Sequence, residues 1–186
     1  MRSAVVDTSS WCSSPVENGT AISRRTARLV ARGFFGIGIE NGKTIENVGT
    51  LWRTAQAFGV DFIFTIGGRY YRQNSDTTKA WKHLPLHEYG SVDDFFRSKP
   101  RDSEVVGIEI ADGSVPLPRF QHPERAIYLL GAEDIGISSE ARRQCSRLVV
   151  IPSSLCLNVA VAGSIVLYDR LAKASRPWPR RWLGTG

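Results

Sequence analysis

The chain has 186 residues, which suits one domain, and 42% of them are hydrophobic, enough for a sizeable core. Its 24 Lys and Arg against 18 Asp and Glu give a formal net charge of +6, which favours a polyanionic partner. No apolar run approaches the roughly 18 residues of a membrane span, and the N-terminus lacks the apolar core of a signal peptide. We therefore expect a soluble, cytoplasmic protein with no membrane partner.

The chain divides into three parts. Residues 1–30 are rich in Ser, Thr and Arg and cannot bury enough surface to repay their ordering entropy, so we expect a mobile basic arm. An organelle transit peptide is the alternative, although Asp7 and Glu17 weigh against it. Residues 31–173 form the predicted domain, and the Pro-broken, basic residues 174–186 read as a tail.

Apolar runs and amphipathic stretches alternate along the domain, beginning with FFGIGIE at 34–40. Such alternation predicts an α/β fold with a mostly parallel sheet and helices on both faces. We expect further strands at 61–67, 104–110, 126–131 and 147–151, and helices at 45–60 and near 91–97, 138–145 and 158–172.

The stretch at 67–83 is long, polar, basic and aromatic, as is typical of a functional loop. Cations interleaved with stacking faces suit single-stranded RNA, whereas the alternative is a solvated connection whose aromatics pack locally. The candidate RNA-binding cations are Arg69, Arg72, Lys79 and Lys82.

No metal site is predicted. His83 and His87 have a spacing that suits a metal on a helix, but Pro85 lies between them and disfavours that helix. His122 has no partner visible in the sequence. The cysteines are few, far apart and without a C-x-x-C pair, so free thiols are expected: Cys12, Cys145 and Cys156.

The segment GFFGIGIEN at 33–41 mimics a dinucleotide-binding fingerprint, which would indicate a nicotinamide-dependent oxidoreductase. Asn41 stands where the third glycine belongs, and the glycines fall inside the predicted strand. Both features argue against this function.

Three glycine-containing motifs follow predicted strands: NVGTLWR (47–53), LGAEDIG (130–136) and IPSSLCLNVAVAG (151–163). Ligands of open parallel sheets collect at such carboxyl ends. In this order and at these intervals, the motifs resemble those of the SpoU/TrmH class of SPOUT RNA methyltransferases, from about Phe34 to Leu171.

The resemblance implies a C-terminal trefoil knot, which pattern reasoning alone would not choose. It also implies S-adenosylmethionine as cofactor, transfer of its methyl group to a ribose 2'-hydroxyl in tRNA or rRNA, and a homodimer in which one subunit's Arg completes the other's site. The dimer would bury the first and last helices, with contacts from Val161, Ile165 and Tyr168. The implied cofactor-binding residues are Glu109, Gly131, Ile151, Cys156 and Leu157.

The resemblance places Arg53 at the catalytic position. A guanidinium stays protonated, so we expect Arg53 mainly to bind the adjacent phosphate and stabilise the developing alkoxide. Asn47 would orient Arg53, and Glu133 would hold the turn at the cofactor pocket. Asn158 would pair with Glu133 or Asn47, and Gly49 would open the helix mouth to the substrate.

Each of these residues also has an ordinary structural interpretation. Asn47 and Asn158 suit helix N-caps, Arg53 suits a solvated helix position, and Glu133 with Gly136 suits a common turn. Taken singly these interpretations are preferable, but the set as a whole favours the site.

The third motif departs from the family pattern, because its connection between Ile-Pro and Leu-Asn is short and Cys156 replaces a serine. A thiol donates hydrogen bonds poorly, so Ser153 or Ser154 would have to substitute. A catalytically inactive, RNA-binding SPOUT dimer is therefore the alternative function.

Overall fold

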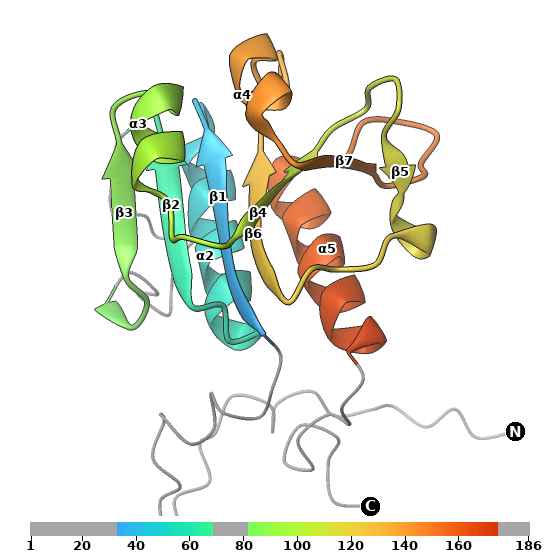
Figure 1. Ribbon diagram of the computed structural model, residues 1–186, viewed down its shortest axis with the longest axis horizontal. Helices are drawn as coiled ribbons and strands as arrows, with labels where there is room; N and C mark the ends of the chain where they lie inside the picture. Colours follow the sequence, from blue (N-terminus) through green and yellow to red (C-terminus); the bar gives the residue numbers. More distant parts are fainter. Residues whose placement is uncertain (1–32, 69–81, 175–186) are drawn as a thin grey trace, which may run out of the picture.

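The structure, a computed structural model, describes residues 33–68 and 82–174 (Figure 1). The predicted arm, most of the predicted RNA-binding loop and nearly all of the predicted tail lie outside these residues. The elements are β1 (Phe34–Glu40), α2 (Ile45–Ala57), β2 (Phe62–Ile66), β3 (Leu86–Tyr89), α3 (Val92–Ser98), β4 (Glu104–Ile108), β5 (Val115–Pro116), the 3-10 helix η3 (Leu117–Arg119), β6 (Arg125–Leu130), α4 (Ser139–Gln144), β7 (Arg147–Val150) and α5 (Val159–Lys173).

The described strands form one seven-stranded sheet in the order β3-β2-β1-β6-β4-β7-β5, and every pairing in it is parallel. The predicted parallel α/β fold is thereby confirmed. Because all strands point the same way, the segments that follow β1, β4, β6 and β7 emerge at one edge of the sheet (Figure 1).

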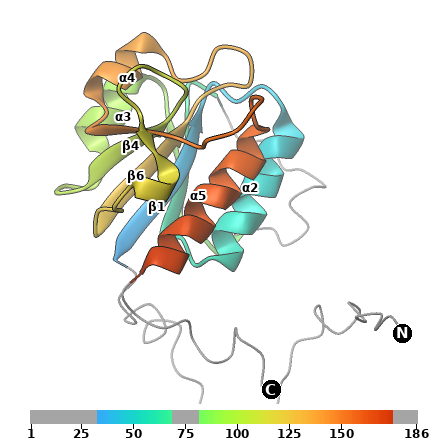
Figure 2. The same cartoon turned by 90° about the vertical axis from the view of Figure 1, so that its right-hand side faces the viewer.

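Helices cover both faces of the sheet. On one face α2 and α5 lie side by side (Figure 2), while α3 and α4 pack with the second hydrophobic cluster on the other. The apolar stripe of α2 is fully buried at Leu51, Trp52 and Ala55. Gly163 permits the close approach of α5, since a Cβ there would lie 2.4 Å from Cδ1 of Leu51.

The glycines of β1 serve packing within the sheet. A Cβ on Gly36 would lie 2.2 Å from the ring of Phe62, and one on Gly38 would lie 2.4 Å from the carbonyl oxygen of Phe64. Both glycines lie inside the strand rather than in a strand-to-helix turn. The dinucleotide fingerprint therefore lacks the phosphate-binding turn that it needs.

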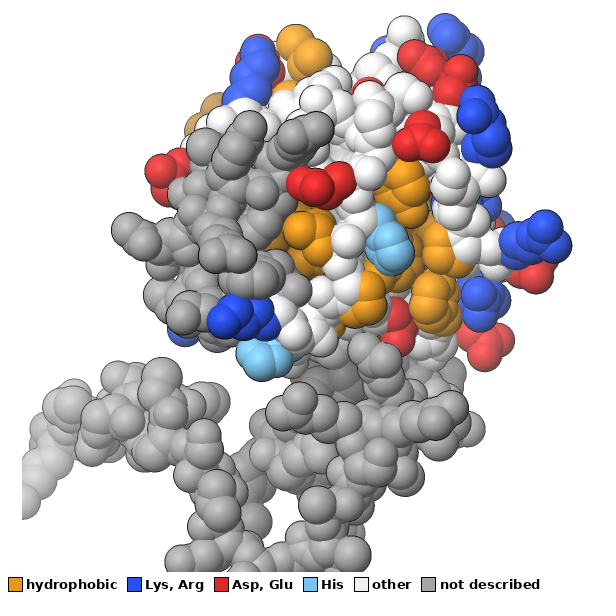
Figure 3. Space-filling model, turned by 90° about the vertical axis from the view of Figure 1, so that its left-hand side faces the viewer, with side chains coloured by type: hydrophobic (Ala, Val, Ile, Leu, Met, Phe, Trp, Pro, Cys, Tyr) orange, Lys and Arg blue, Asp and Glu red, His pale blue; other side chains and the backbone are white. Residues whose placement is uncertain are grey.

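Two strands are missing from the sequence-based prediction. β5 has only two residues, too few for a periodic pattern. β3 lies at the edge of the sheet, where His87 is exposed against the rings of Phe62 and Tyr89, so the absence of a helix at His83 and His87 is confirmed. Figure 3 faces this edge and shows hydrophobic side chains at its surface.

A buried polar network holds the end of α5 against the sheet. His122, with a side chain only 5% exposed, lies 2.6 Å from the hydroxyl of Tyr128 through Nδ1 and 2.9 Å from the carboxylate of Asp169 through Nε2. Arg170 donates to the same hydroxyl at 3.1 Å and to the carbonyl of Pro123 at 2.7 Å. The sequence did not reveal these partners of His122, which are up to 47 residues away.

Among the described helices, none combines the length and apolar character that crossing a membrane requires. The trefoil knot stays a prediction.

Candidate functional site

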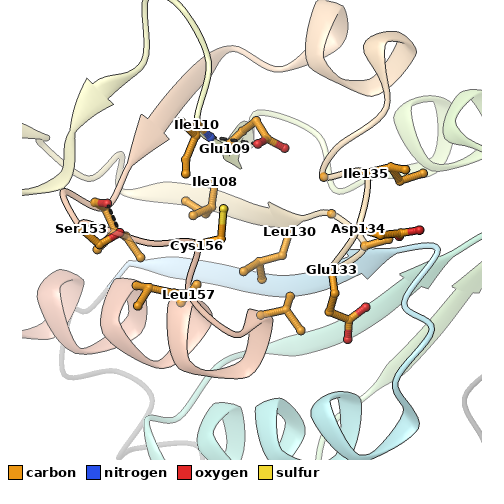
Figure 4. Close-up of a pocket in the computed structure, with 16 residues that line it drawn as sticks. Ile108, Glu109, Ile110, Leu130, Glu133, Asp134, Ile135, Ser153, Cys156 and Leu157 are labelled. Atoms are coloured by element: carbon orange, nitrogen blue, oxygen red, sulfur yellow. Dashed lines mark hydrogen bonds between the residues drawn. The ribbon is translucent and has the colours of Figure 1, made fainter.

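A pocket of about 400 Å³ lies at the carboxyl ends of β4, β6 and β7 (Figure 4). Its volume is in the range of small-molecule sites. All five predicted cofactor-binding residues line it, and so do Glu133 and apolar side chains that the prediction did not name. The lining residues are Ile108, Glu109, Ile110, Leu130, Gly131, Ala132, Glu133, Asp134, Ile135, Gly136, Ile151, Ser153, Cys156, Leu157, Val159 and Ala162.

The turn after β6 is compact because it has glycine at both ends. A Cβ on Gly131 would lie 1.9 Å from the carbonyl carbon of Gly136, so the turn itself excludes a side chain at position 131. Gly136 has a φ of +67°, and a Cβ there would lie 2.2 Å from Oε2 of Glu109. Both glycines thus keep the turn closed against the strand ends.

Two carboxylates hold this turn at consecutive backbone amides. Oε2 of Glu109 accepts from the N–H of Ile137 at 2.7 Å, and Oε2 of Glu40 accepts from the N–H of Ser138 at 2.9 Å. Sequence reasoning missed Glu40, which is only 2% exposed. The available signal was its position, because Glu40 and Glu109 both stand at the carboxyl end of a buried strand.

Asn47, Glu133 and Asn158 are joined side chain to side chain. Nδ2 of Asn47 donates to Oε1 of Glu133 at 2.8 Å, and Nδ2 of Asn158 donates to Oδ1 of Asn47 at 2.9 Å. Burial opposes ionisation of Glu133, but the hydrogen bonds of Asn47 and Thr44 and of nearby backbone groups lower the pKa of this carboxyl below its ordinary value. The three predicted residues therefore meet beside the pocket.

The ordinary structural interpretations hold in part. Asn158 does cap α5, since Oδ1 accepts from the N–H groups of Ala160 and Val161, and its amide nitrogen remains available for Asn47. The N-cap of α2 is Thr44, so the interpretation of Asn47 as a simple cap is wrong.

Arg53 lies one to two turns further along α2, is exposed and is absent from the pocket lining. Its side chain has no hydrogen bond or ion pair to residues 33–68 or 82–174. Gly49 is buried, so the expectation that it opens the helix mouth is wrong for the single chain. The structure thus brings the predicted site residues together at the pocket, with the exception of Arg53.

The connection from β7 to α5 forms one wall of the pocket. Figure 4 shows Cys156 with its sulfur toward Ile108. Ser153 uses its hydroxyl within the connection, donating to the carbonyl of Leu155 at 2.8 Å. Cys156 is an exposed free thiol, whereas burial and the nearby charge of Glu40 raise the pKa of Cys145 to about 12.

Of the predicted RNA-binding cations, Arg69, Arg72 and Lys79 lie outside the described residues, while Lys82 is exposed. No group of three or more potential metal ligands gathers among the residues that the structure describes.

Comparisons with known proteins identify the family of the chain and proteins of similar fold. The sequence model of the SpoU rRNA Methylase family matches residues 35–168. The chain therefore belongs to the SpoU rRNA Methylase family, as its three motifs predicted.

The similar proteins have related activities in their names. A Mus musculus tRNA (guanosine(18)-2'-O)-methyltransferase is 28% identical over an alignment of 134 residues, and the match covers 66% of this chain and 8% of that protein. The Escherichia coli K12 tRNA (guanosine(18)-2'-O)-methyltransferase is 25% identical over an alignment of 131 residues, and the match covers 67% of this chain and 57% of that protein. This chain thus spans less than two thirds of the length of either relative.

A crystal structure of an AdoMet-bound rRNA methyltransferase from Sinorhizobium meliloti is similar in fold. The TM-score is 0.66 at 25% identity, over 82% of this chain and 58% of that one.

Proposed function

We propose that the chain is an S-adenosylmethionine-dependent methyltransferase that modifies a ribose 2'-hydroxyl in tRNA or rRNA. The observation that carries this proposal is the hydrogen-bonded set of Asn47, Glu133 and Asn158 beside the pocket, within a member of the SpoU family. Both curated relatives named above are tRNA 2'-O-methyltransferases, which supports the reaction type and leaves the RNA and its nucleotide open.

The pocket has the chemistry that S-adenosylmethionine needs. Leu130, Ile151 and Leu157 supply apolar faces for an adenine ring, and the strand-end loops bring backbone polar groups to the same space. Glu133 adds negative charge at the rim, which suits a sulfonium cation or an ammonium group, whereas the charge of Asp134 is offset by its ion pair with Lys43 at 2.6 Å. When bound, the cofactor supplies an already activated methyl group, so no metal is required for the transfer.

The protein then has to position the ribose and stabilise the charge that forms on its oxygen. We assign that task to Arg53, whose guanidinium can bind the neighbouring phosphate through two N–H groups and stabilise the alkoxide. Asn47 and Asn158 hold Glu133 and, with it, the cofactor turn. We therefore assign Asn47, Glu133 and Asn158 the role of supporting the turn after β6, and not that of accepting a proton.

Because Arg53 is outside the pocket of its own chain, we propose that a second copy supplies it in a homodimer. Apolar side chains on α5 and just before it are exposed and support this arrangement: Val161 is 48% exposed, Tyr168 56% and Leu155 79%. Ile165 is half-buried next to them. The proposed dimer would cover this strip, and the trefoil knot would lie in the connection that leads from β7 to α5.

The alternative remains an RNA-binding SPOUT dimer without methyl transfer. The observation that favours it is Cys156 at the serine position, in a short connection where Ser153 is already engaged with Leu155. Isothermal titration calorimetry with S-adenosylmethionine separates the two functions, because the inactive form predicts no cofactor binding.

The direct test is transfer of a labelled methyl group from S-adenosylmethionine to unmodified tRNA and rRNA by the purified chain. We expect label in RNA that survives as a 2'-O-methylated nucleotide after nuclease digestion. Substrate with a 2'-deoxyribose at the mapped nucleotide should accept no label. Label on a base, or none on any RNA despite cofactor binding, would contradict the proposal.

A further inference from the structure

A second cavity adjoins the cofactor pocket, since Ile110 lines both. It has a volume of about 580 Å³ and lies between the loop after β4, helix α4 and strand β7. We call it the arginine pocket, because two consecutive arginines line it: Ile110, Asp112, Ser139, Arg142, Arg143 and Leu148 form most of its wall.

Arg142 and Arg143 are exposed cations at the last turn of α4. Neither side chain has a hydrogen bond or ion pair to another residue in the described part of the chain. Arg147 differs, because it is engaged with Glu104 at 2.9 Å. Two guanidinium groups that line one cavity and have no acceptor among the described residues are suited to phosphate oxygens, which they bind through paired N–H groups.

The rest of the wall is suited to a nucleoside attached to that phosphate. Ile110 is 62% exposed and Leu148 is half-buried, so the cavity offers an apolar surface on which a base can lie. Asp112 and Ser139 can accept hydrogen bonds from a hydroxyl or an amino group. Two arginines and one aspartate leave a net charge of 2 − 1 = +1, which favours a ligand with negative charge and hydrogen-bond donors.

We propose that the arginine pocket binds a nucleotide unit of the RNA substrate, with its phosphate on Arg142 and Arg143 and its base on Ile110. This inference rests on the proposed function. Because Ile110 also lines the cofactor pocket, a nucleotide held here fixes the RNA strand relative to the methyl donor. A free nucleotide has the same chemistry as the RNA unit, so the test must distinguish the two.

The test compares the double variant Arg142→Ala/Arg143→Ala with the unaltered chain by fluorescence anisotropy on labelled tRNA over a salt series. We expect at least tenfold weaker binding and, for two lost phosphate contacts on a single strand, a salt slope smaller by roughly 1.4. The matched control is Arg97→Ala/Arg101→Ala, which also removes two exposed arginines but outside both pockets, and should leave both quantities nearly unchanged.

A second variant separates charge from geometry. Arg142→Lys/Arg143→Lys keeps both charges but loses the planar fork, so we expect a retained salt slope with an intermediate affinity. Calorimetry with AMP examines the free nucleotide: binding as tight as that of RNA, and equally sensitive to the two arginines, would overturn the assignment to RNA.

The outcomes distinguish this inference from the proposed function. If the unaltered chain methylates RNA while Arg142→Ala/Arg143→Ala keeps its affinity and salt slope, the arginine pocket is overturned and the methyltransferase stands. If RNA binding depends on both arginines but no methyl is transferred, the pocket stands and the methyltransferase is overturned. Absence of RNA binding by the unaltered chain would overturn both.

Discussion

Nδ2 of Asn158 lies 2.9 Å from Oδ1 of Asn47, although 111 residues separate them in the chain. The bond joins the first turn of α2 to the N-cap of α5. Asn47 also donates a hydrogen bond to Glu133, which follows β6. Three strand ends are thus tied together by side chains rather than by backbone pairing. Through Glu133 this tie supports the turn after β6, which Glu109 and Glu40 also hold.

Asn47→Ala should therefore reduce methyl-transfer activity more than it reduces the stability of the fold. The change removes the donor to Glu133 and the acceptor of Asn158, and solvent screening limits a hydrogen bond to an exposed carboxylate to about 1 kcal/mol or less. We expect a tenfold or larger loss of kcat/KM and a fall of only a few degrees in Tm, measured by methyl transfer and thermal unfolding.

A control on the same helix makes this result specific. Thr50 is exposed on α2 and its hydroxyl donates to the carbonyl of Glu46 within the helix, so Thr50→Ala should leave kcat/KM within about twofold. Asn47→Asp should be worse than Asn47→Ala at neutral pH, because it sets a second carboxylate against Glu133. Equal activity of Asn47→Asp and the unaltered chain would refute the assigned role.

Gly136→Ala should destabilise the chain and abolish cofactor binding. A φ of +67° costs an alanine about 1 kcal/mol, and its Cβ would lie 2.2 Å from the Glu109 carboxylate, which must then release Ile137. We expect a total loss on the order of 2 to 3 kcal/mol in the free energy of unfolding, measured by urea denaturation.

Gly113→Ala is the matched control for Gly136→Ala. Gly113 also has a positive φ, +80°, but a Cβ there would meet nothing within 4 Å. This variant should show the conformational cost alone, about 1 kcal/mol, with unchanged affinity for S-adenosylmethionine. If the two variants lose the same stability, the contact with Glu109 is not what demands glycine.

Cys156 should react with a thiol reagent only while the cofactor pocket is empty. It is exposed and lines the pocket, whereas Cys145 is half-buried with a pKa raised to about 12 by burial and by Glu40. Peptide mass spectrometry after brief treatment with iodoacetamide near pH 8 should find the label on Cys156 and little on Cys145.

Cofactor protection provides the informative comparison. Saturating S-adenosylmethionine should slow labelling of Cys156 at least tenfold, while ATP at the same concentration should not. Labelling that is indifferent to S-adenosylmethionine would place the cofactor elsewhere, or show that the chain does not bind it.

The sequence pattern predicted the sheet well but not its edges. The apolar runs of β1, β2, β4, β6 and β7 are long enough to be recognised, whereas LHEY of β3 follows a proline and exposes His87 and Glu88. A short edge strand has no repeating apolar face to read. Its pairing with β2 becomes visible only in three dimensions.

The site was predictable through its motifs and not through periodicity. The resemblance placed Asn47, Glu133 and Asn158 in one site and paired Asn158 with Glu133 or Asn47. It did not pair Asn47 with Glu133, and nothing local to Asn47 indicates a partner 86 residues away. The buried charges of Glu40 and Arg170 were missed for a related reason. In the sequence both resemble solvated residues, because the backbone groups that they bind are distant along the chain.

The stability of the fold should depend on pH through His122. Burial lowers the pKa of its imidazole; the hydrogen bond and charge of Asp169 oppose this, and the cations of Arg170 and Lys173 add to it. In the unfolded chain the imidazole takes up a proton near pH 6.5, whereas the folded chain does so only at lower pH. The free energy of unfolding is therefore fully retained above about pH 6.5 and falls as the pH drops below it.

Urea denaturation at several pH values between 7.5 and 5.5 measures this dependence. His122→Gln should flatten it, although the variant will be less stable throughout because it leaves Tyr128 and Asp169 with altered partners. His83 is exposed, so His83→Gln should keep the slope of the unaltered chain. A slope that survives in His122→Gln would assign the dependence to another group.

Mixing two inactive variants tests whether a second copy supplies Arg53. Arg53→Ala lacks the phosphate-binding cation, and Cys156→Trp fills the cofactor pocket from an exposed position without disturbing the core. In a heterodimer of the two, one site combines an intact pocket with an intact Arg53. Random exchange of subunits makes half of the dimers mixed, so one site in four is complete and about a quarter of normal activity should return.

The control for this mixture is each variant alone at the same total concentration, which should remain at least a hundredfold below the unaltered chain. Arg53→Lys should recover little in either setting, because an ammonium group cannot bind two phosphate oxygens in one plane. If the mixture stays inactive although an affinity tag on one variant co-purifies the other, Arg53 acts within its own chain. Activity of Arg53→Ala alone would remove Arg53 from the mechanism altogether.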